Sequence, residues 1–271
     1  MTTLLETIDL KKSFGGLQAV AGVSIQVAQG SLHTIIGPNG AGKTTFFNLL
    51  CGAIRPTAGK VIFKGREITG QPVHRAIHHG IGRSFQISNL FPNLTAFEHA
   101  RLAAQALSSH RYRIFGRATA LPTETRRAHE ALTLVGLSDQ AHVPAAALSH
   151  GDKRRLELAM LLAPDPELLM LDEPTAGMAS EQVPQLIAVI RRVRQDTRKT
   201  ILLIEHRMDV VMSISDRITV MHQGRVLAEG TPQAIAANAE VQRAYLGELY
   251  GDLAAGGQPA GRAKHRDDGT A

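Results

Sequence analysis

The segment that most constrains the fold of this chain is Gly37–Thr44, which reads Gly-Pro-Asn-Gly-Ala-Gly-Lys-Thr. It has the spacing Gly-x4-Gly-Lys-Thr, and it lies between an apolar run at 31–36 that predicts a strand and one at 45–50 that predicts a helix. Glycines let the backbone of such a loop turn its N–H groups inward, while the start of the helix and Lys43 add positive charge. The context favours a phosphate-binding loop for a nucleoside triphosphate over an ordinary glycine-rich turn.

Backbone and side chains of this loop are expected to share the binding of the triphosphate. Lys43 supplies a full positive charge for the phosphates. The hydroxyl of Thr44 is the expected ligand of a Mg²⁺ ion that bridges the β- and γ-phosphates, because Mg²⁺ prefers oxygen ligands. The residues expected at the triphosphate are Gly37, Pro38, Asn39, Gly40, Ala41, Gly42, Lys43, Thr44 and Thr45.

A chain of 271 residues can bury a full core, and we expect one large domain with a subdomain. Cys51 is the single cysteine, so an internal disulfide framework is excluded and a reducing compartment is favoured. No apolar run approaches the roughly 18 residues that span a bilayer, and residues 1–6 lack the pattern of a signal peptide. These features predict a cytoplasmic protein. The net charge of +6 does not choose between nucleic acid, an anionic membrane surface and solubility alone.

Predicted secondary structure changes character twice along the chain. Short β segments are predicted at Leu4–Asp9, Val23–Val27 and Val61–Phe63. Helices are predicted at Thr95–Leu107, Thr123–Val135 and His150–Leu162. Apolar runs at Leu168–Leu171 and Ile201–Ile204 then predict parallel strands that are covered on both faces.

This order predicts an α/β fold in which helices flank a mainly parallel sheet and a helical subdomain is inserted. We expect a domain over 1–250, with a core at about 1–86 and 164–250 and the helical subdomain at about 87–163. Residues 251–271 are rich in Gly and Ala and have few large apolar side chains. Such a segment cannot offset its ordering entropy, so we expect a disordered tail.

A helix is predicted between the two apolar strands, which makes a β-α-β unit. Ser180 is the expected N-cap, Glu181 falls in the first turn and Pro184 lies near the start, where proline is tolerated. Ligands of parallel sheets gather at the carboxyl ends of the strands. The residues that follow each apolar run are therefore candidates for the site.

Two acids, Asp172 and Glu173, follow the first of these runs. Negative charge at the end of a buried strand is costly unless a cation is near. Asp172 is placed to hold Mg²⁺ through its water shell, and Glu173 could accept a proton from the water that attacks the γ-phosphorus. The alternative is a helix N-cap followed by a solvated glutamate, since Pro174 ends the strand.

His206 ends the next run, and Gln86 lies where the sheet gives way to the helical insert. The imidazole of His206 could reach the γ-phosphate, although most of the 12 histidines of the chain are expected to be structural. The amide of Gln86 could touch metal or water and move with the insert.

These motifs together resemble an ATP-binding cassette (ABC) ATPase over residues 4–247. The order is the phosphate-binding loop, Gln86, the signature segment Leu148–Asp152, the acids Asp172 and Glu173, and His206. The resemblance implies ATP and Mg²⁺ as cofactors, a P-loop NTPase core with an N-terminal antiparallel β subdomain, and an ABC-type helical insert. It also implies catalytic roles for Lys43, Gln86, Glu173 and His206, and metal-binding roles for Thr44, Gln86 and Asp172.

The same resemblance implies a head-to-tail dimer in which the signature of one chain caps the ATP of its partner. The signature residues are Ser149, His150, Gly151 and Asp152. Free N–H groups at the start of the helix that follows would suit a γ-phosphate, although a plain helix cap uses the same groups. In the family an aromatic ring stacks on adenine, and Phe14 stands at that position. The alternative for Phe14 is a buried core residue.

The chain departs from the family pattern at two places. His150 and Asp152 stand where many members have glycine and glutamine, which puts bulk beside the γ-phosphate. Met178-Ala179-Ser180 stands where many members have a leucine followed by an aspartate. The second change puts coupling across the dimer in question.

Segments at 82–95, 172–178 and 244–248 further resemble the cytoplasmic subunits of branched-chain amino acid importers. This implies an ATPase that powers uptake of such solutes, with a second ATPase subunit, membrane permease subunits and a solute-binding protein as partners, at the cytoplasmic face of the inner membrane. Leu90, Phe91 and Pro92 are the expected docking face, with internal packing as the alternative.

Two other functions are open to a chain with these motifs. One is an ABC ATPase that acts on nucleic acid, which the basic charge favours, but the stretch between Lys43 and Ser149 is too short for a long coiled-coil arm. We therefore expect no nucleic acid partner. The other is a regulatory nucleotide binder without turnover. The basic stretch 110–127 could face lipid headgroups or be a solvated loop.

Overall fold

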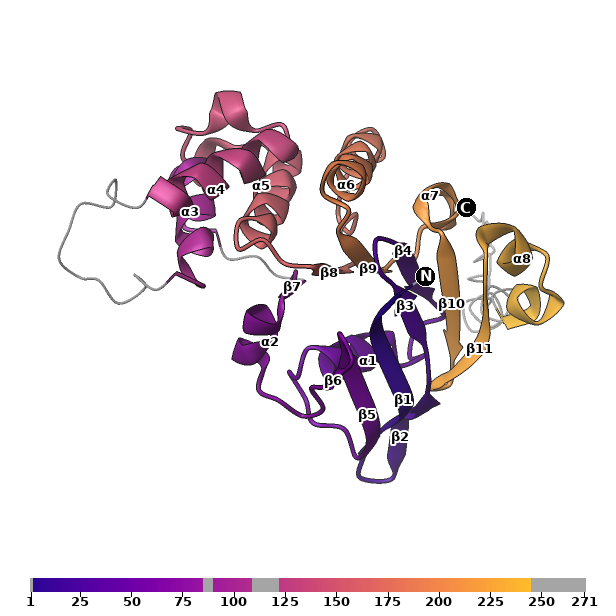
Figure 1. Ribbon diagram of the computed structural model, residues 1–271. Coiled ribbons are helices and arrows are strands. Elements are labelled where there is room, and N and C mark those ends of the chain that lie inside the picture. Colours follow the sequence, from indigo (N-terminus) through magenta and orange to yellow (C-terminus); the bar gives the residue numbers. More distant parts are fainter. Residues whose placement is uncertain (1, 85–89, 109–121, 245–271) are drawn as a thin grey trace, which may run out of the picture.

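The computed structural model describes residues 2–84, 90–108 and 122–244, which form two β-sheets and the helices around them (Figure 1). The first sheet is antiparallel, with strand order β2-β1-β5-β6 and β3 paired to β1. Its strands are β1 (Thr3–Phe14), β2 (Leu17–Val23), β3 (Gln26–Ala28), β5 (Ala58–Phe63) and β6 (Arg66–Glu67). The antiparallel β subdomain implied by the family resemblance is therefore present.

The second sheet has the order β11-β10-β4-β9-β8-β7. Every pair from β10 to β7 is parallel, and β11 runs antiparallel to β10 at one edge. Its strands are β4 (Leu32–Ile36), β7 (Ile81–Arg83), β8 (Leu168–Asp172), β9 (Thr200–Ile204), β10 (Arg217–His222) and β11 (Arg225–Gly230). Because β4, β8 and β9 are buried at every position, the apolar runs of the sequence are confirmed as central parallel strands.

Eight α-helices are assigned within the described residues. They are α1 (Lys43–Leu50), α2 (Val73–His79), α3 (Ala96–Gln105), α4 (Pro122–Leu134), α5 (His150–Leu162), α6 (Val183–Thr197), α7 (Met208–Ile214) and α8 (Pro232–Ala236). The helices predicted after the phosphate-binding loop and at 95–107, 123–135 and 150–162 are confirmed, with small shifts at their ends. Within the part of the chain that is described, no helix combines the length and the apolar character needed to cross a bilayer.

Helix α1 packs between the two sheets. Its residues Phe46 and Phe47 are fully buried in a cluster that includes Leu5 from β1 and Leu168 from β8. Cys51, just after α1, is buried in the same cluster. The loop before α1 is therefore held by a helix that contacts both layers.

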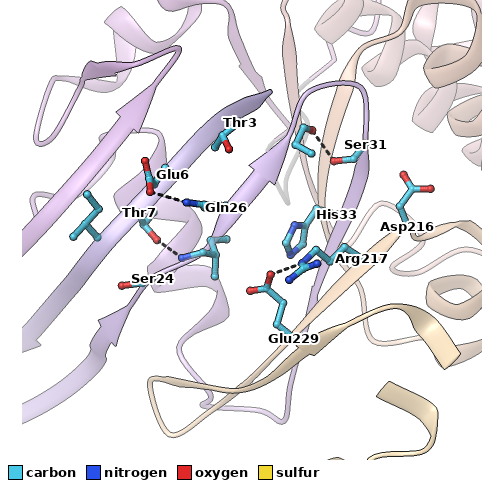
Figure 2. Close-up of a pocket in the computed structure, with 13 residues that line it drawn as sticks. Thr3, Glu6, Thr7, Ser24, Gln26, Ser31, His33, Asp216, Arg217 and Glu229 are labelled. Carbon is cyan, nitrogen blue, oxygen red and sulfur yellow. Dashed lines mark hydrogen bonds and ion pairs between the residues drawn. The ribbon is translucent and has the colours of Figure 1, made fainter. Parts of the chain in front are cut away.

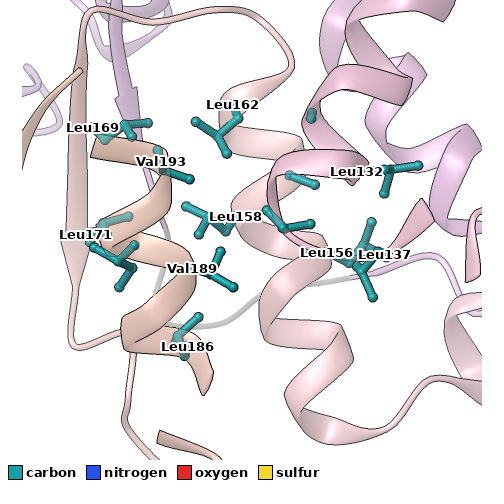
Figure 3. Packing of buried hydrophobic residues seen from close by; sticks show 14 of the residues in the cluster. Leu132, Leu137, Leu156, Leu158, Leu162, Leu169, Leu171, Leu186, Val189 and Val193 are labelled. Atoms are coloured by element: carbon teal, nitrogen blue, oxygen red, sulfur yellow. The ribbon is translucent and has the colours of Figure 1, made fainter. Parts of the chain in front are cut away.

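The helical region α3–α5 lies on the opposite side of the molecule from the antiparallel sheet, and α6 lies between α5 and α7 (Figure 1). Figure 3 shows how one apolar cluster joins these parts: Leu156 and Leu158 of α5 lie between Leu132 of α4 and Val189 of α6. Leu171 of β8 belongs to the same cluster. Strand β8, which ends at Asp172, and helix α5, which begins at the signature segment, therefore share one apolar core with α6.

Two predictions about element boundaries are wrong. The β segment predicted at Val23–Val27 is interrupted, because β2 ends at Val23 and β3 begins only at Gln26. Helix α6 begins at Val183 after the N-cap Gln182, so Ser180 does not cap it and Glu181 lies before its first turn. Pro184 accounts for this start, because proline suits the first turn of a helix.

Candidate functional site

The phosphate-binding loop connects β4 to α1 and contains two places where only glycine fits. A Cβ at Gly37 would lie 2.1 Å from the carbonyl oxygen of Met221, and a Cβ at Gly42 would lie 2.3 Å from that of Ala19. Gly42 also has a φ of +94°, a conformation that other L residues rarely adopt. The loop is therefore packed tightly against β10 and β2.

Lys43 is the first residue of α1 and is almost fully buried. Its Nζ donates hydrogen bonds to the carbonyl oxygens of Gly37 (2.6 Å) and Pro38 (2.7 Å), which fold the ammonium over the loop. The N-cap of α1 is Gly42, which has no side chain to satisfy the first N–H groups of the helix. These N–H groups and the ammonium together make the loop a site for an anion.

A cavity of about 560 Å³ lies over this loop, a volume in the range of small-molecule sites. Residues 39–45 form one wall, and Thr44 has an exposed side chain there. The other walls come from distant parts of the sequence, and include Phe14, Leu17, Glu173, His206 and Gln223. The fold therefore brings Lys43, Thr44, Glu173 and His206 together at one cavity.

Phe14 ends β1, and its side chain is 50% exposed at the cavity. Nζ of Lys12 lies 5.0 Å from the centroid of its ring. A core role for Phe14 is excluded, since the core residues of the same strand, such as Leu5 and Leu10, are fully buried. An exposed ring at one end of the cavity fits a flat aromatic base.

Asp172 is the last residue of β8, and its side chain is only 2% exposed. Its Oδ2 lies 3.5 Å from Nη2 of Arg83, while its Oδ1 is buried and has no hydrogen-bond partner among the described residues. Burial raises the pKa of Asp172 above its ordinary value, although the Arg83 guanidinium opposes that effect. A buried carboxylate oxygen of this kind fits a cation or its bound water.

Glu173 and His206 form a pair at the cavity. Nε2 of His206 lies 2.6 Å from Oε1 of Glu173. Glu173 has a φ of +48° and its N–H donates to the carbonyl oxygen of Ile204 (3.0 Å), which ties the end of β8 to β9. A non-glycine residue in this region of φ is uncommon and occurs often at functional sites.

Glu205, between β9 and His206, holds the backbone next to this pair. Its buried carboxylate accepts hydrogen bonds from the hydroxyl of Thr175 and from the N–H groups of His206 (2.8 Å) and Arg207 (3.2 Å). These contacts fix the backbone that carries His206. Sequence reasoning misses Glu205, because its acidic character alone does not distinguish it from an exposed glutamate.

Gln86 lies outside the described residues. The signature residues Ser149 and His150 are exposed and do not line the cavity of their own chain. Oγ of Ser149 accepts a hydrogen bond from the N–H of Asp152 (3.1 Å) and caps α5. Burial raises the pKa of Asp152, but the Ser149 hydroxyl and Arg155 bring it below its ordinary value.

A second cavity of about 830 Å³ lies between the antiparallel sheet and the amino ends of β4 and β10 (Figure 2). Buried His33 lines it, with Nε2 at 2.7 Å from Oγ1 of Thr219, and burial lowers the pKa of His33 to about 4. Arg217 and Glu229 pair with each other beside it. None of the site residues predicted from the sequence lines this cavity.

Comparison with known families matches two models. The model described as "ABC transporter" matches residues 20–176, and one described as "Branched-chain amino acid ATP-binding cassette transporter" matches residues 225–250. The first match contains the phosphate-binding loop, the signature segment and the acid pair.

Two relatives are similar over nearly their whole length. The chain is 42% identical to the high-affinity branched-chain amino acid transport ATP-binding protein BraF of Pseudomonas aeruginosa over 250 residues, which covers 90% of this chain and 98% of BraF. It is 41% identical to LivG of Escherichia coli, a protein described in the same words, over 253 residues, with 90% and 98% covered.

The fold is also similar to that of a solved cassette. The ADP conformation of MJ1267, an ATP-binding cassette of an ABC transporter, superposes with a TM-score of 0.80 at 28% identity, covering 91% of this chain and 100% of MJ1267. The likeness therefore includes both sheets and the helical region.

Proposed function

This chain belongs to the ABC transporter family as one of its ATPases, and on that premise we propose that it powers the uptake of branched-chain amino acids or a related small solute. The observation that carries the proposal is the single cavity that combines Lys43, Thr44, Glu173 and His206. The substrate class rests on the similarity to BraF and LivG.

In this proposal, each wall of the cavity binds one part of ATP. The N–H groups of residues 39–45 and the ammonium of Lys43 hold the phosphates. To do so, Nζ of Lys43 exchanges its bonds to the carbonyl oxygens of Gly37 and Pro38 for the phosphate oxygens. The ring of Phe14 stacks on adenine at the other end of the cavity.

Thr44 and Asp172 are the described residues that would hold Mg²⁺, together with Gln86. Oδ1 of Asp172, which has no hydrogen-bond partner in the described part of the chain, and the hydroxyl of exposed Thr44 are oxygen ligands of the kind this ion prefers. When bound, Mg²⁺ would neutralise negative charge on the β- and γ-phosphates.

Glu173 is the proposed general base for hydrolysis. Its Oε1 would accept the proton of a water that attacks the γ-phosphorus, and the imidazole of His206 at 2.6 Å holds the carboxylate in place. The buried contacts of Glu205 keep His206 at the end of β9.

A second ATPase subunit completes the site. Ser149 and His150 are exposed at the start of α5 and lie away from the cavity of their own chain, where a partner's γ-phosphate could meet the N–H groups of the helix. Two chains arranged head to tail would place two ATP molecules between them. ATP binding would then close the dimer, and hydrolysis would open it.

This motion would pass to membrane permease subunits at the cytoplasmic face of the membrane, and a solute-binding protein would deliver the solute to them. Phe91 is 62% exposed at the start of the helical region, and its N–H donates to Nε2 of His99 (2.9 Å). An exposed ring on a segment fixed in this way suits contact with a partner helix.

Transport in reconstituted vesicles tests this proposal. The chain would be purified with its native permease subunits, and the solute-binding protein would be added on the opposite side of the membrane. Uptake of labelled leucine, isoleucine and valine would be measured with ATP on the side of the ATPase. We expect uptake that depends on ATP and is lost in the variant Lys43→Ala. ATP hydrolysis without uptake of any branched-chain amino acid would contradict the substrate class and leave the ATPase function intact.

A further inference from the structure

Arg83 connects the two elements that carry the proposed metal ligands. It is the last residue of β7, and its side chain is only 12% exposed. Nη2 lies 3.5 Å from Oδ2 of Asp172 on β8, and Nη1 donates to Oδ1 of Asn48 on α1 (2.6 Å). One side chain thus spans from the strand that carries Asp172 to the helix that carries Thr44.

Asn48 lies on the same face of α1 as Thr44. It follows Thr44 by four residues, which is about one helical turn, so the two side chains lie on the same face of the helix. Nη1 of Arg83 also lies 2.9 Å from Sγ of Cys51 at the end of α1. Arg83 therefore holds the face of α1 that begins with Thr44.

The contact with Asp172 leaves its two oxygens unequal. Oδ2 faces the guanidinium, while Oδ1 has no partner among the described residues. Ser84, the residue after β7, also orients Asp172, because its Oγ accepts a hydrogen bond from the N–H of Asp172 (3.0 Å). Backbone and side chain of Asp172 are both oriented by the segment that leads to Gln86.

From this geometry we propose that Arg83 is a positioning residue for Mg²⁺, which sets the spacing between Thr44 and Asp172 and keeps Oδ1 of Asp172 free for the metal. The inference rests on the proposed roles of Thr44 and Asp172. The planar guanidinium suits this task because it donates in two directions at fixed geometry, which the single ammonium of a lysine cannot do.

Nucleotide binding with and without metal tests the proposal. The full chain would be titrated with the non-hydrolysable ATP analogue adenylyl imidodiphosphate, once with excess Mg²⁺ and once with EDTA, for the wild type, Arg83→Gln and Arg83→Lys. The ratio of the affinity with Mg²⁺ to the affinity in EDTA measures what the metal contributes. We expect this ratio to be about tenfold or more smaller in Arg83→Gln than in the wild type, as is usual when a group that orients a metal ligand is removed. The affinity measured in EDTA should stay close to that of the wild type, because no metal is present for Arg83 to influence.

Arg83→Lys keeps the charge and is the variant to use if Arg83→Gln does not fold. It should recover part of the effect of Mg²⁺. The matched control is Arg194→Gln, which removes another arginine–aspartate pair (2.7 Å to Asp216) at the amino edge of the same sheet, away from the proposed metal ligands. This variant should keep the full effect of Mg²⁺.

Two results would overturn the role of Arg83: an unchanged effect of Mg²⁺ in Arg83→Gln, or equal losses of affinity with and without metal, which indicate general disruption of the loop. A wild-type chain whose affinity does not respond to Mg²⁺ would instead overturn the proposed metal site itself. The half-saturating Mg²⁺ concentration for ATP hydrolysis gives a second readout, since it should rise in Arg83→Gln more than the rate at saturating Mg²⁺ falls.

Discussion

Nε2 of His206 lies 2.6 Å from Oε1 of Glu173, and the two residues follow the ends of neighbouring parallel strands. The pair forms because β8 and β9 share their register up to Asp172 and Ile204, and because Glu173 then turns to donate its N–H to Ile204. A carboxylate held by an imidazole at the mouth of a phosphate-binding cavity is equipped to accept a proton from water.

Replacing Glu173 with glutamine removes this base and keeps its shape. We expect ATP hydrolysis to slow by about 10² or more, because an amide cannot accept the proton. ATP binding and ATP-driven dimerisation should persist. The measurement is the rate of phosphate release together with size-exclusion chromatography in ATP, and unchanged turnover would remove Glu173 from the role of base.

The variant His206→Ala tests whether the imidazole positions the base. Loss of the 2.6 Å contact frees the Glu173 side chain, and misplacement of a reacting group costs up to about 10²-fold in rate. We expect kcat to fall by this order, with a small change in the KM for ATP. His222→Ala, at the end of β10, is the control. A large rise in KM with kcat unchanged would show that His206 acts in binding alone.

The departure at His150 gives a third prediction. His150 is exposed at the start of α5, and the capping bond of the helix is made by Ser149. We therefore expect the rate of hydrolysis in His150→Gly to stay within about tenfold of the wild type, which corresponds to ~1.4 kcal/mol. The assay is steady-state hydrolysis at saturating ATP. A much larger loss would mean that the imidazole takes part in the reaction across the dimer.

Buried His33 makes the free energy of unfolding depend on pH. Its pKa is lowered from 6.5 to about 4 by burial, so between these values the unfolded chain binds a proton that the folded chain excludes. The contribution of His33 to the free energy of unfolding is fully present above pH 6.5. It falls by ~1.4 kcal/mol per pH unit, or ~3 kcal/mol in total, as the pH drops to 4.

Urea denaturation of the wild type and His33→Leu at several pH values measures this effect. In His33→Leu the free energy of unfolding should fall less steeply between pH 6.5 and pH 4 than in the wild type, whatever its value at pH 7. His74→Gln, at an exposed position, should keep the slope of the wild type. An identical slope in His33→Leu and the wild type would show that His33 does not exclude the proton.

The central strands and the phosphate-binding loop could be predicted because their signals are local. The runs Leu168–Leu171 in β8 and Ile201–Ile204 in β9 are apolar without interruption, and Gly37 and Gly42 occur at fixed spacing before Lys43. The residues that follow these runs then reach one edge of the sheet, as parallel strands require.

Other features depend on partners far apart in the sequence. The strand β7 is three residues long and is defined by its pairing with β8, which no local pattern reveals. Arg83 is missed for the same reason, since its partners Asn48 and Asp172 lie far from it in sequence. The interruption between β2 and β3 arises where Ser24 and Ile25 make single contacts with β1, through Asp9 and Thr7, outside the regular ladder.

We expect ATP to bind between two chains, held by the cavity of one and the signature segment of the other. A crystal structure of Glu173→Gln grown with ATP and Mg²⁺ would show whether it does. We predict a head-to-tail dimer in which the γ-phosphate contacts Lys43 of one protomer and Ser149 of its partner. Monomers in which no nucleotide is bound at Lys43 would rule out this arrangement.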